Sequence, residues 1–232
     1  MKIYGGVYYS ENGISTSIRG MHMQTELLGC ISSNVSGFNK VGYQKELPVI
    51  SSFSEYVGVH GLSKVKDDNV GRLYQSGNPL DLALGKKGYF QCVTPNGVKL
   101  IRDGRFKLDK NGNLLTLENF KVLGNDGQAI KFKHMPEKLE DIKISVDGKI
   151  SVMNIKENKM QDMGTLSVVS SDGNVMSDVD VRQGFSETSN VSLHEEFFNM
   201  VPVRRNFDAN RQLYIIQNDE LTKAIQSLGS SS

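Results

Sequence analysis

The chain has 232 residues, enough for one large domain or two small ones that bury a core. Its 27 basic and 26 acidic residues give a formal net charge of +1, without the basic excess typical of nucleic-acid-binding proteins. No apolar stretch approaches the ~18 residues of a membrane-spanning helix, and residues 1–13 lack the apolar segment of a secretory signal. We therefore expect no nucleic-acid partner, no insertion into a membrane and no cleaved signal peptide.

Residues 12–36 are predicted to form an amphipathic helix. Ser10 or Asn12 is suited to cap its N-terminus, and Gly37 stands where its C-terminus is expected. Mostly apolar residues recur along it at intervals of four and three, which is the spacing of a coiled-coil seam. The predicted seam consists of Ile14, Ile18, Met21, Thr25, Leu28, Ser32 and Val35.

A β-rich domain of antiparallel meanders is predicted over residues 73–181. Short alternating apolar runs are separated there by Asn-Gly and Asp-Gly pairs, which tolerate the positive φ of hairpin turns. The clearest hairpins are residues 142–152 and a pair of strands at residues 106–108 and 115–117. DKNGN at residues 109–113 is predicted to turn the second hairpin, because the glycine and glutamate of an EF-hand calcium loop are absent. The turn pairs begin at Asn96, Asp103, Asn111, Asp126, Asp147 and Asp172.

Residues 191–228 return to helical periodicity. Three polar residues of the predicted seam, Arg204, Arg211 and Asn218, lie seven apart, where polar side chains cost stability but fix register or partner choice. Pro202 predicts a kink or a break, because it removes a hydrogen bond and clashes with the carbonyl of Phe198. The predicted seam consists of Leu193, Phe197, Met200, Arg204, Phe207, Arg211, Tyr214, Asn218, Leu221, Ile225 and Leu228.

These regions predict an α+β fold, with an antiparallel β-rich middle domain flanked by long amphipathic N- and C-terminal helices. Neither helix has an obvious globular domain against which to bury its apolar stripe. Each stripe therefore requires the other terminus or another subunit.

No group of residues indicates catalysis. The four histidines have no metal-ligand spacing, and neither a phosphate-binding loop nor a serine nucleophile motif is present. Cys30 and Cys92 are isolated in the sequence, so two buried free thiols are favoured over a disulfide. We expect no enzyme activity, no cofactor and no metal site.

Three segments resemble the signatures of the bacterial flagellar rod and hook proteins. The first is LGCISSNVSGFNKVGY, residues 28–43, although Gly29 replaces the aspartate of the family signature. The second is SGNPLDLALGKKGYFQ followed by RDGRFKLDKNGNLLT, residues 102–116, and the third is residues 183–212. The glycines of residues 75–91 could equally wrap a ligand, but the resemblance identifies this stretch as the entrance of the β-rich domain.

The resemblance implies a structural subunit of the flagellar basal-body rod, similar to the distal and proximal rod proteins. Such proteins leave the cytoplasm through the flagellar type III export apparatus without a cleaved signal peptide. They polymerise helically with copies of themselves and with other rod and hook proteins to form the motor's drive shaft. Their terminal helices pair as a coiled coil on assembly. The implied assembly interface consists of Ile14, Ile18, Met21, Leu28, Ile31, Asn34, Val35, Phe197, Met200, Phe207, Asn210, Tyr214, Leu221, Ile225 and Leu228.

The expected organisation has four parts. These are an N-terminal assembly helix with its signature loop (1–45), a linker (46–72), the β-rich domain (73–181) and a C-terminal assembly helix (182–232). Residues 163–181 lack a passage usual in the family, so the end of the β-rich domain is expected to be shortened. The alternative is a monomeric β-rich binding module with helical arms. The aromatic residues available for its ligand cleft are Tyr89, Phe90, Phe106 and Phe120.

Overall fold

The computed structural model describes residues 13–50, 62–132, 135–136, 138–154 and 159–229. The chain divides into two compact units. The helical unit comprises residues 1–35, 46–65 and 193–232, and the β-rich unit comprises residues 36–45 and 66–192. The predicted α+β class, with a β-rich middle between terminal helices, is confirmed.

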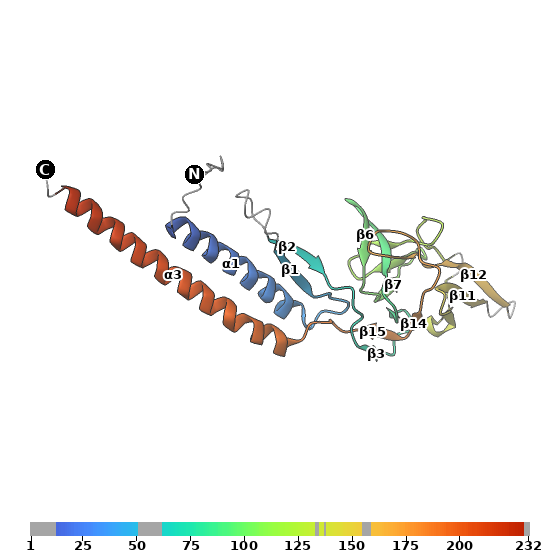
Figure 1. The fold of residues 1–232 in the computed structure, drawn as a ribbon. Coiled ribbons are helices and arrows are strands. Elements are labelled where there is room, and N and C mark those ends of the chain that lie inside the picture. The colour runs from blue at the N-terminus through green and yellow to red at the C-terminus, as the bar shows by residue number, and fades with distance from the viewer. Residues whose placement is uncertain (1–12, 51–61, 133–134, 137, 155–158, 230–232) are drawn as a thin grey trace, which may run out of the picture. The chain divides into compact units, whose positions relative to one another are not determined.

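The helical unit contains two long helices and a pair of strands (Figure 1). Helix α1 spans Gly13–Gly37 and helix α3 spans Leu193–Gly229, within two residues of the predicted helices. Strand β1 (Glu46–Ile50) is hydrogen-bonded to strand β2 (Leu62–Lys66). The segment expected as a linker at residues 46–72 therefore contains two paired strands.

Pro202 does not interrupt α3, which forms one continuous helix of 37 residues (Figure 1). Of the predicted kink or break, the break therefore does not occur. Pro202 lies on the exposed side of the helix, where water can hydrate the carbonyl of Phe198 that loses its N–H donor. Glu195 and Glu196 stand in the first turn, where negative charge complements the helix dipole.

The β-rich unit consists of small antiparallel sheets. One sheet has the order β13-β5-β9-β8-β7 with β6 added to β5, a second has the order β10-β11-β12, and two further sheets pair β14 with β4 and β15 with β3. A short 3-10 helix, Leu139–Asp141, precedes β10. The strands are β3 (Leu73–Gln75), β4 (Leu82–Leu84), β5 (Tyr89–Thr94), β6 (Gly97–Ile101), β7 (Phe106–Leu108), β8 (Leu114–Thr116), β9 (Lys121–Val122), β10 (Ile142–Ile144), β11 (Lys149–Asn154), β12 (Lys159–Thr165), β13 (Val168–Val169), β14 (Val181–Gln183) and β15 (Phe185–Glu187).

Both predicted hairpins are confirmed. Strands β10 and β11 pair Ile144 with Ile150 across a turn, and strands β7 and β8 pair Leu108 with Leu114. The second hairpin turns at Asp109, whose carboxylate accepts hydrogen bonds from Asn113 that hold its pKa below the usual value. The DKNGN segment is thus a hairpin turn, as predicted.

The hairpin turn predicted at Asp103-Gly104 is wrong. Gly104 does not have a positive φ, unlike the glycines of the other five predicted turn pairs. A Cβ at Gly104 would lie 1.9 Å from the carbonyl oxygen of Leu82, so this glycine allows close contact with strand β4.

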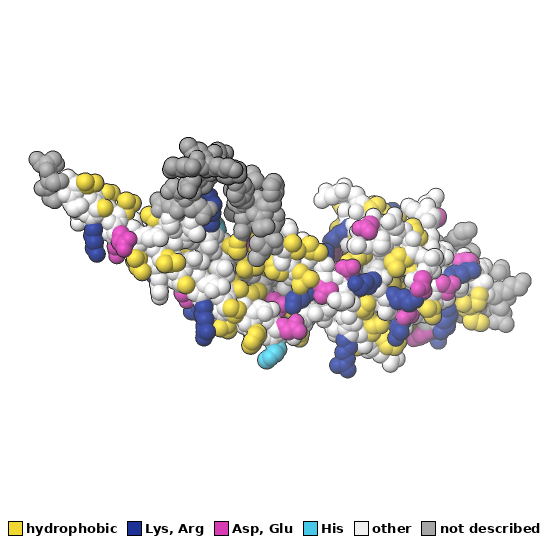
Figure 2. Space-filling model, in the orientation of Figure 1, with side chains coloured by type: hydrophobic (Ala, Val, Ile, Leu, Met, Phe, Trp, Pro, Cys, Tyr) yellow, Lys and Arg dark blue, Asp and Glu magenta, His cyan; other side chains and the backbone are white. Residues whose placement is uncertain are grey.

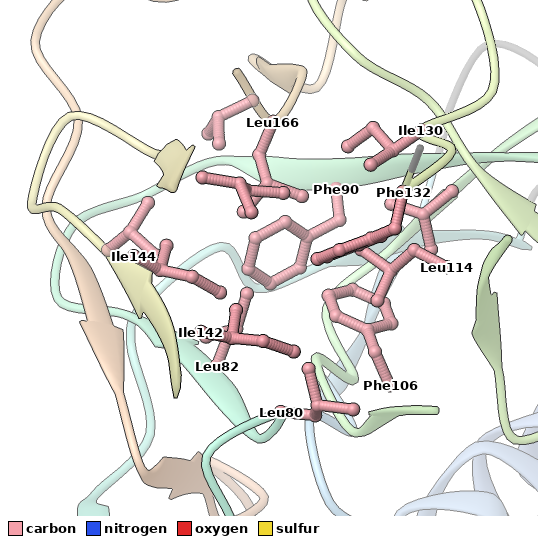
Figure 3. Packing of buried hydrophobic residues seen from close by; sticks show 14 of the residues in the cluster. Leu80, Leu82, Phe90, Phe106, Leu114, Ile130, Phe132, Ile142, Ile144 and Leu166 are labelled. Atoms are coloured by element: carbon pink, nitrogen blue, oxygen red, sulfur yellow. The ribbon is translucent and has the colours of Figure 1, made fainter. Parts of the chain in front are cut away.

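The core of the β-rich unit gathers around Phe90 (Figure 3). Its ring meets the ring of Phe106 edge-on, with centroids 5.3 Å apart. Leu80, Leu82 and Leu84 belong to the same core, so residues 75–91 form the expected corner of the β-rich domain.

A buried ion pair lies beside this core. Nε of Arg102 donates to Oε2 of Glu187 at 2.6 Å, and the two side chains are only 2% and 4% exposed. The other guanidinium nitrogens donate to the carbonyls of Gly88 and Leu84, and the second oxygen of Glu187 accepts from the N–H of Gly71. Each guanidinium nitrogen of Arg102 and each carboxylate oxygen of Glu187 therefore has a hydrogen-bond partner.

The β-rich unit extends beyond the predicted bounds of 73–181. Strand β14 crosses the predicted boundary at residue 181 and pairs with β4. Strand β15 lies wholly beyond that boundary and pairs with β3. The signature loop also joins this unit, because the N–H of Gly42 donates to the carbonyl of Glu187 and the hydroxyl of Tyr89 donates to the side chain of Gln44.

Both cysteines are free and buried, as predicted. Burial raises the pKa of the Cys92 thiol. The thiol of Cys30 donates to the carbonyl of Glu46 at 3.3 Å, so it contributes to packing between α1 and β1.

Candidate assembly surface

Helices α1 and α3 run antiparallel within the helical unit (Figure 1). Near the start of α1, Gly13 faces the side chain of Gln217, and Gly20 faces the side chain of Asn210. Near its end, Nδ2 of Asn34 donates to Oε2 of Glu196 at 3.2 Å. Each step forward along α1 is therefore matched by an equal step backward along α3.

The inward face of α3 differs from the predicted seam at every second position. Leu193, Met200, Phe207 and Tyr214 are shielded as predicted, but Phe197, Arg204, Arg211 and Asn218 are exposed. The residue before each of these four is shielded instead. The observed inward face consists of Leu193, Glu196, Met200, Val203, Phe207, Asn210, Tyr214 and Gln217.

The face of α1 toward α3 contains small and polar residues. A Cβ at Gly13 would lie 2.0 Å from Nε2 of Gln217, and a Cβ at Gly20 would lie 2.5 Å from Nδ2 of Asn210. The two glycines thus leave room for amide side chains of α3. Ser17, buried on the same face, donates to the carbonyl of Gly13.

Large apolar residues remain on the outside of the helical unit. Phe198 is 74% exposed, Ile225 is 61% exposed and Leu221 is 49% exposed. Figure 2 shows such hydrophobic side chains distributed along the helices. Contiguous exposed apolar surface of this kind marks sites of protein–protein contact. The other large apolar residues exposed on the two helices are Ile18, Phe197, Val201, Leu213, Ile215, Ile216 and Leu228.

The predicted interface residues fall into three groups. Met200, Phe207, Asn210, Tyr214, Ile31 and Asn34 lie on the inward faces of the helices. Ile18, Phe197, Leu221, Ile225 and Leu228 are exposed. The remaining residues, Ile14, Met21, Leu28 and Val35, are half-buried.

Asn34 connects α1 to strand β1 and to α3. Its Oδ1 accepts from the N–H of Glu46 at 2.8 Å, and its Nδ2 donates to the carbonyl of Glu46 at 2.9 Å. Asn34 is helical and 1% exposed, and its amide binds both backbone groups of one β1 residue. The carboxylate of Glu46 bonds Lys64 at 3.1 Å and raises the pKa of that ammonium group.

Within the part of the chain that the structure describes, no group of three or more histidine, cysteine, aspartate or glutamate side chains is arranged to hold a metal ion. No described helix is long and apolar enough to cross a membrane.

Models of known families match two segments of the chain. Residues 83–152 match the flagellar hook protein FlgE/F/G D1 domain, and residues 182–227 match the flagellar basal body rod FlgEFG protein C-terminal domain. The chain belongs to the flagellar basal-body rod protein family. The first match lies within the β-rich unit, and the second covers β14, β15 and nearly all of α3.

Relatives of this rod-family chain match along nearly its whole length. It is 27% identical to the flagellar basal-body rod protein FlgG of Bacillus subtilis, over 92% of this chain and 97% of the relative. It is 26% identical to the rod protein FlgF of Rhizobium meliloti, over 95% of this chain and 99% of the relative. A FlgF of Mesorhizobium japonicum is 28% identical over 88% of this chain and 92% of the relative.

Several residues on the inward faces of the two helices of this rod protein were not predicted from the sequence. On α3 they are the polar residues Glu196 and Gln217 and the apolar Val203, and on α1 they include the glycines Gly13 and Gly20. A signal was present, because the two glycines are seven residues apart and so are Asn210 and Gln217. This heptad spacing marks a shared helix face as clearly as apolar residues do.

Replacing Asn34 by alanine is expected to destabilise the helical unit of the rod protein by about 1–3 kcal/mol, because the N–H and carbonyl of Glu46 lose buried partners. Urea unfolding followed by far-UV circular dichroism measures this loss. The exposed Ser32→Ala on the same helix is the control and should change stability by less than about 0.5 kcal/mol. Equal effects of the two substitutions would contradict the role of Asn34.

Proposed function

We propose that this protein is a structural subunit of the bacterial flagellar basal-body rod. It polymerises helically through the outer faces of its terminal helices, which pack as a coiled coil with the helices of neighbouring subunits. The observation that carries this proposal is the row of large apolar side chains left exposed on α3 after α1 has covered its inward face. Each such side chain contributes about 1.5–3 kcal/mol when a neighbour buries it.

The partners of such a subunit are copies of itself and other rod and hook proteins. An interface that joins different faces of identical chains generates an open helical assembly. The chain leaves the cytoplasm through the flagellar type III export apparatus without a cleaved signal peptide. Its role is mechanical, and it needs neither catalysis nor a cofactor.

The rival function, a monomeric β-rich binding module, receives less support. Its ligand cleft would require exposed aromatic residues on the β-rich unit. Phe90 and Phe106 instead pack against each other in the core, and Tyr89 is buried with its hydroxyl bonded to Gln44.

Deleting the gene in its own bacterium tests the rod function. We expect cells without hooks and filaments, with swimming restored when the gene is supplied on a plasmid. The protein should also be found by mass spectrometry in basal bodies isolated from the parent strain. Normal swimming of the deletion strain, together with the absence of the protein from basal bodies, would contradict the proposal.

A further inference from the structure

The chain passes between its two compact units four times, at residues 35–36, 45–46, 65–66 and 192–193. At the second passage, two consecutive residues have all of their backbone polar groups hydrogen-bonded. The N–H of Lys45 donates to Oδ1 of Asn190 at 2.7 Å, and its carbonyl accepts from the N–H of Asp67 at 2.8 Å. The N–H and the carbonyl of Glu46 are both bonded by the amide of Asn34. This passage is therefore fixed on both sides, unlike a free linker.

Asn190 links segments beside three of the four passages. Besides accepting from Lys45 at the second passage, its side-chain amide donates through Nδ2 to the carbonyls of Asp67 and Asn69, both at 3.0 Å. These two residues follow the third passage, and Asn190 itself stands shortly before the fourth. Its backbone N–H donates to the carbonyl of Tyr43 at 3.3 Å. One residue therefore joins three stretches of chain that are distant in sequence, all within the β-rich unit.

The first passage is held by the same loop. A Cβ at Gly37 would lie 2.4 Å from the ring of Tyr43, so this glycine lets the ring lie directly against the end of α1. The N–H of Lys40 donates to the carbonyl of Gly37 at 3.0 Å, and the N–H of Tyr43 donates to the carbonyl of Lys40 at 3.3 Å. Tyr43 is in turn bonded to Asn190, so all four passages start from segments that contact one another.

We propose that Asn190 is a clamp that holds residues 43–45 and 67–69 together, so that the connections leaving the β-rich unit act as one stiff element and not as separate flexible linkers. A carboxamide suits this position, because it supplies one acceptor for the N–H of Lys45 and donors for two carbonyls. In a rod subunit, a stiff connection transmits torque along the chain without bending. That consequence rests on the proposed function, whereas the clamp itself does not.

Amide hydrogen exchange of the full-length purified protein, followed residue by residue by NMR, tests the clamp. The variants are Asn190→Ala, which removes the acceptor and the donors, and Asn190→Asp, which keeps an acceptor for Lys45 but has no donor for the carbonyls. The control is Asn69→Ala, because Asn69 is exposed and its backbone carbonyl remains available to Asn190. Tryptic cleavage after Lys45 gives a second readout, since the protease requires local opening of the chain.

We expect Asn190→Ala to speed both exchange at the amides of Lys45 and Asp67 and cleavage after Lys45 by about tenfold or more. Exchange at the amide of Leu82, in strand β4 of the core, should stay within about twofold of the parent protein. Asn190→Asp should speed exchange at Lys45 less than the alanine variant does.

Unchanged exchange at Lys45 and Asp67 in the alanine variant would overturn the proposal. Equal acceleration at Leu82 would also overturn it, because Asn190 would then stabilise the whole β-rich unit and not the connections. An effect of Asn69→Ala as large as that of Asn190→Ala would count against the clamp as well. Each of these results is obtained on the purified protein, so a failure of the clamp is distinguishable from a failure of the rod function in cells.

Discussion

Replacing Arg102 by methionine is expected to lower the unfolding free energy of the β-rich unit by about 3–5 kcal/mol. The substitution leaves the carboxylate of Glu187 buried without its cation and removes three hydrogen bonds from the guanidinium group. Chemical unfolding of the full chain, followed by near-UV circular dichroism of the tyrosines in the β-rich unit, measures the change.

Arg105 supplies a matched control for this experiment. It stands three residues later and pairs with Asp103 at 2.6 Å, but its side chain is 37% exposed. Arg105→Met should therefore cost no more than about 1 kcal/mol. If the two methionine variants are equally stable, the buried ion pair does not stabilise the unit. The double variant Arg102→Met, Glu187→Met is expected to recover part of the loss, because no unpaired charge remains.

Ile225→Asp is expected to abolish rod assembly while leaving the free subunit folded. Ile225 is 61% exposed and lies outside the inward face of α3, so a charge there meets water in the free chain. In an apolar interface between subunits the same charge would be desolvated without a partner, which is strongly unfavourable. Electron microscopy of isolated basal bodies should show no rod beyond the position of this subunit, and cells should not swim.

Gln226→Asp provides the control, because it adds the same charge to the neighbouring exposed residue without removing an apolar side chain. Cells with this variant are expected to retain hooks and to swim. Immunoblots of soluble extracts should show equal amounts of both variants. Rods built by Ile225→Asp at the level of the parent chain would exclude this part of α3 from the assembly interface.

The features that the sequence predicted well are local ones. Hairpins such as residues 142–152 are encoded by a turn pair and a few alternating residues around it, so no distant contact is needed to recognise them. The helix termini at Gly37 and Leu193 are likewise recognisable from residues close to them in the sequence. The strands missed by the prediction depend on distant partners: β15 is three residues long and pairs with β3, more than a hundred residues earlier.

The inward face of α3 was predicted incorrectly for a different reason. Spacing of three and four residues fits either of two faces one residue apart, and apolar content favoured the face with Phe197. In the structure, Glu196 takes the inward position, because Asn34 supplies a buried hydrogen bond to its carboxylate. Apolar content therefore favoured an exposed face of α3 over the face that packs against α1.

The position of Glu187 in the chain also bears on when the protein folds during its synthesis. The partner of Arg102 and the strands that complete β3 and β4 are all supplied by residues 181–187. During synthesis, this ion pair and the pairing of β3 and β4 with their partner strands can therefore form only after residue 187 has left the ribosome.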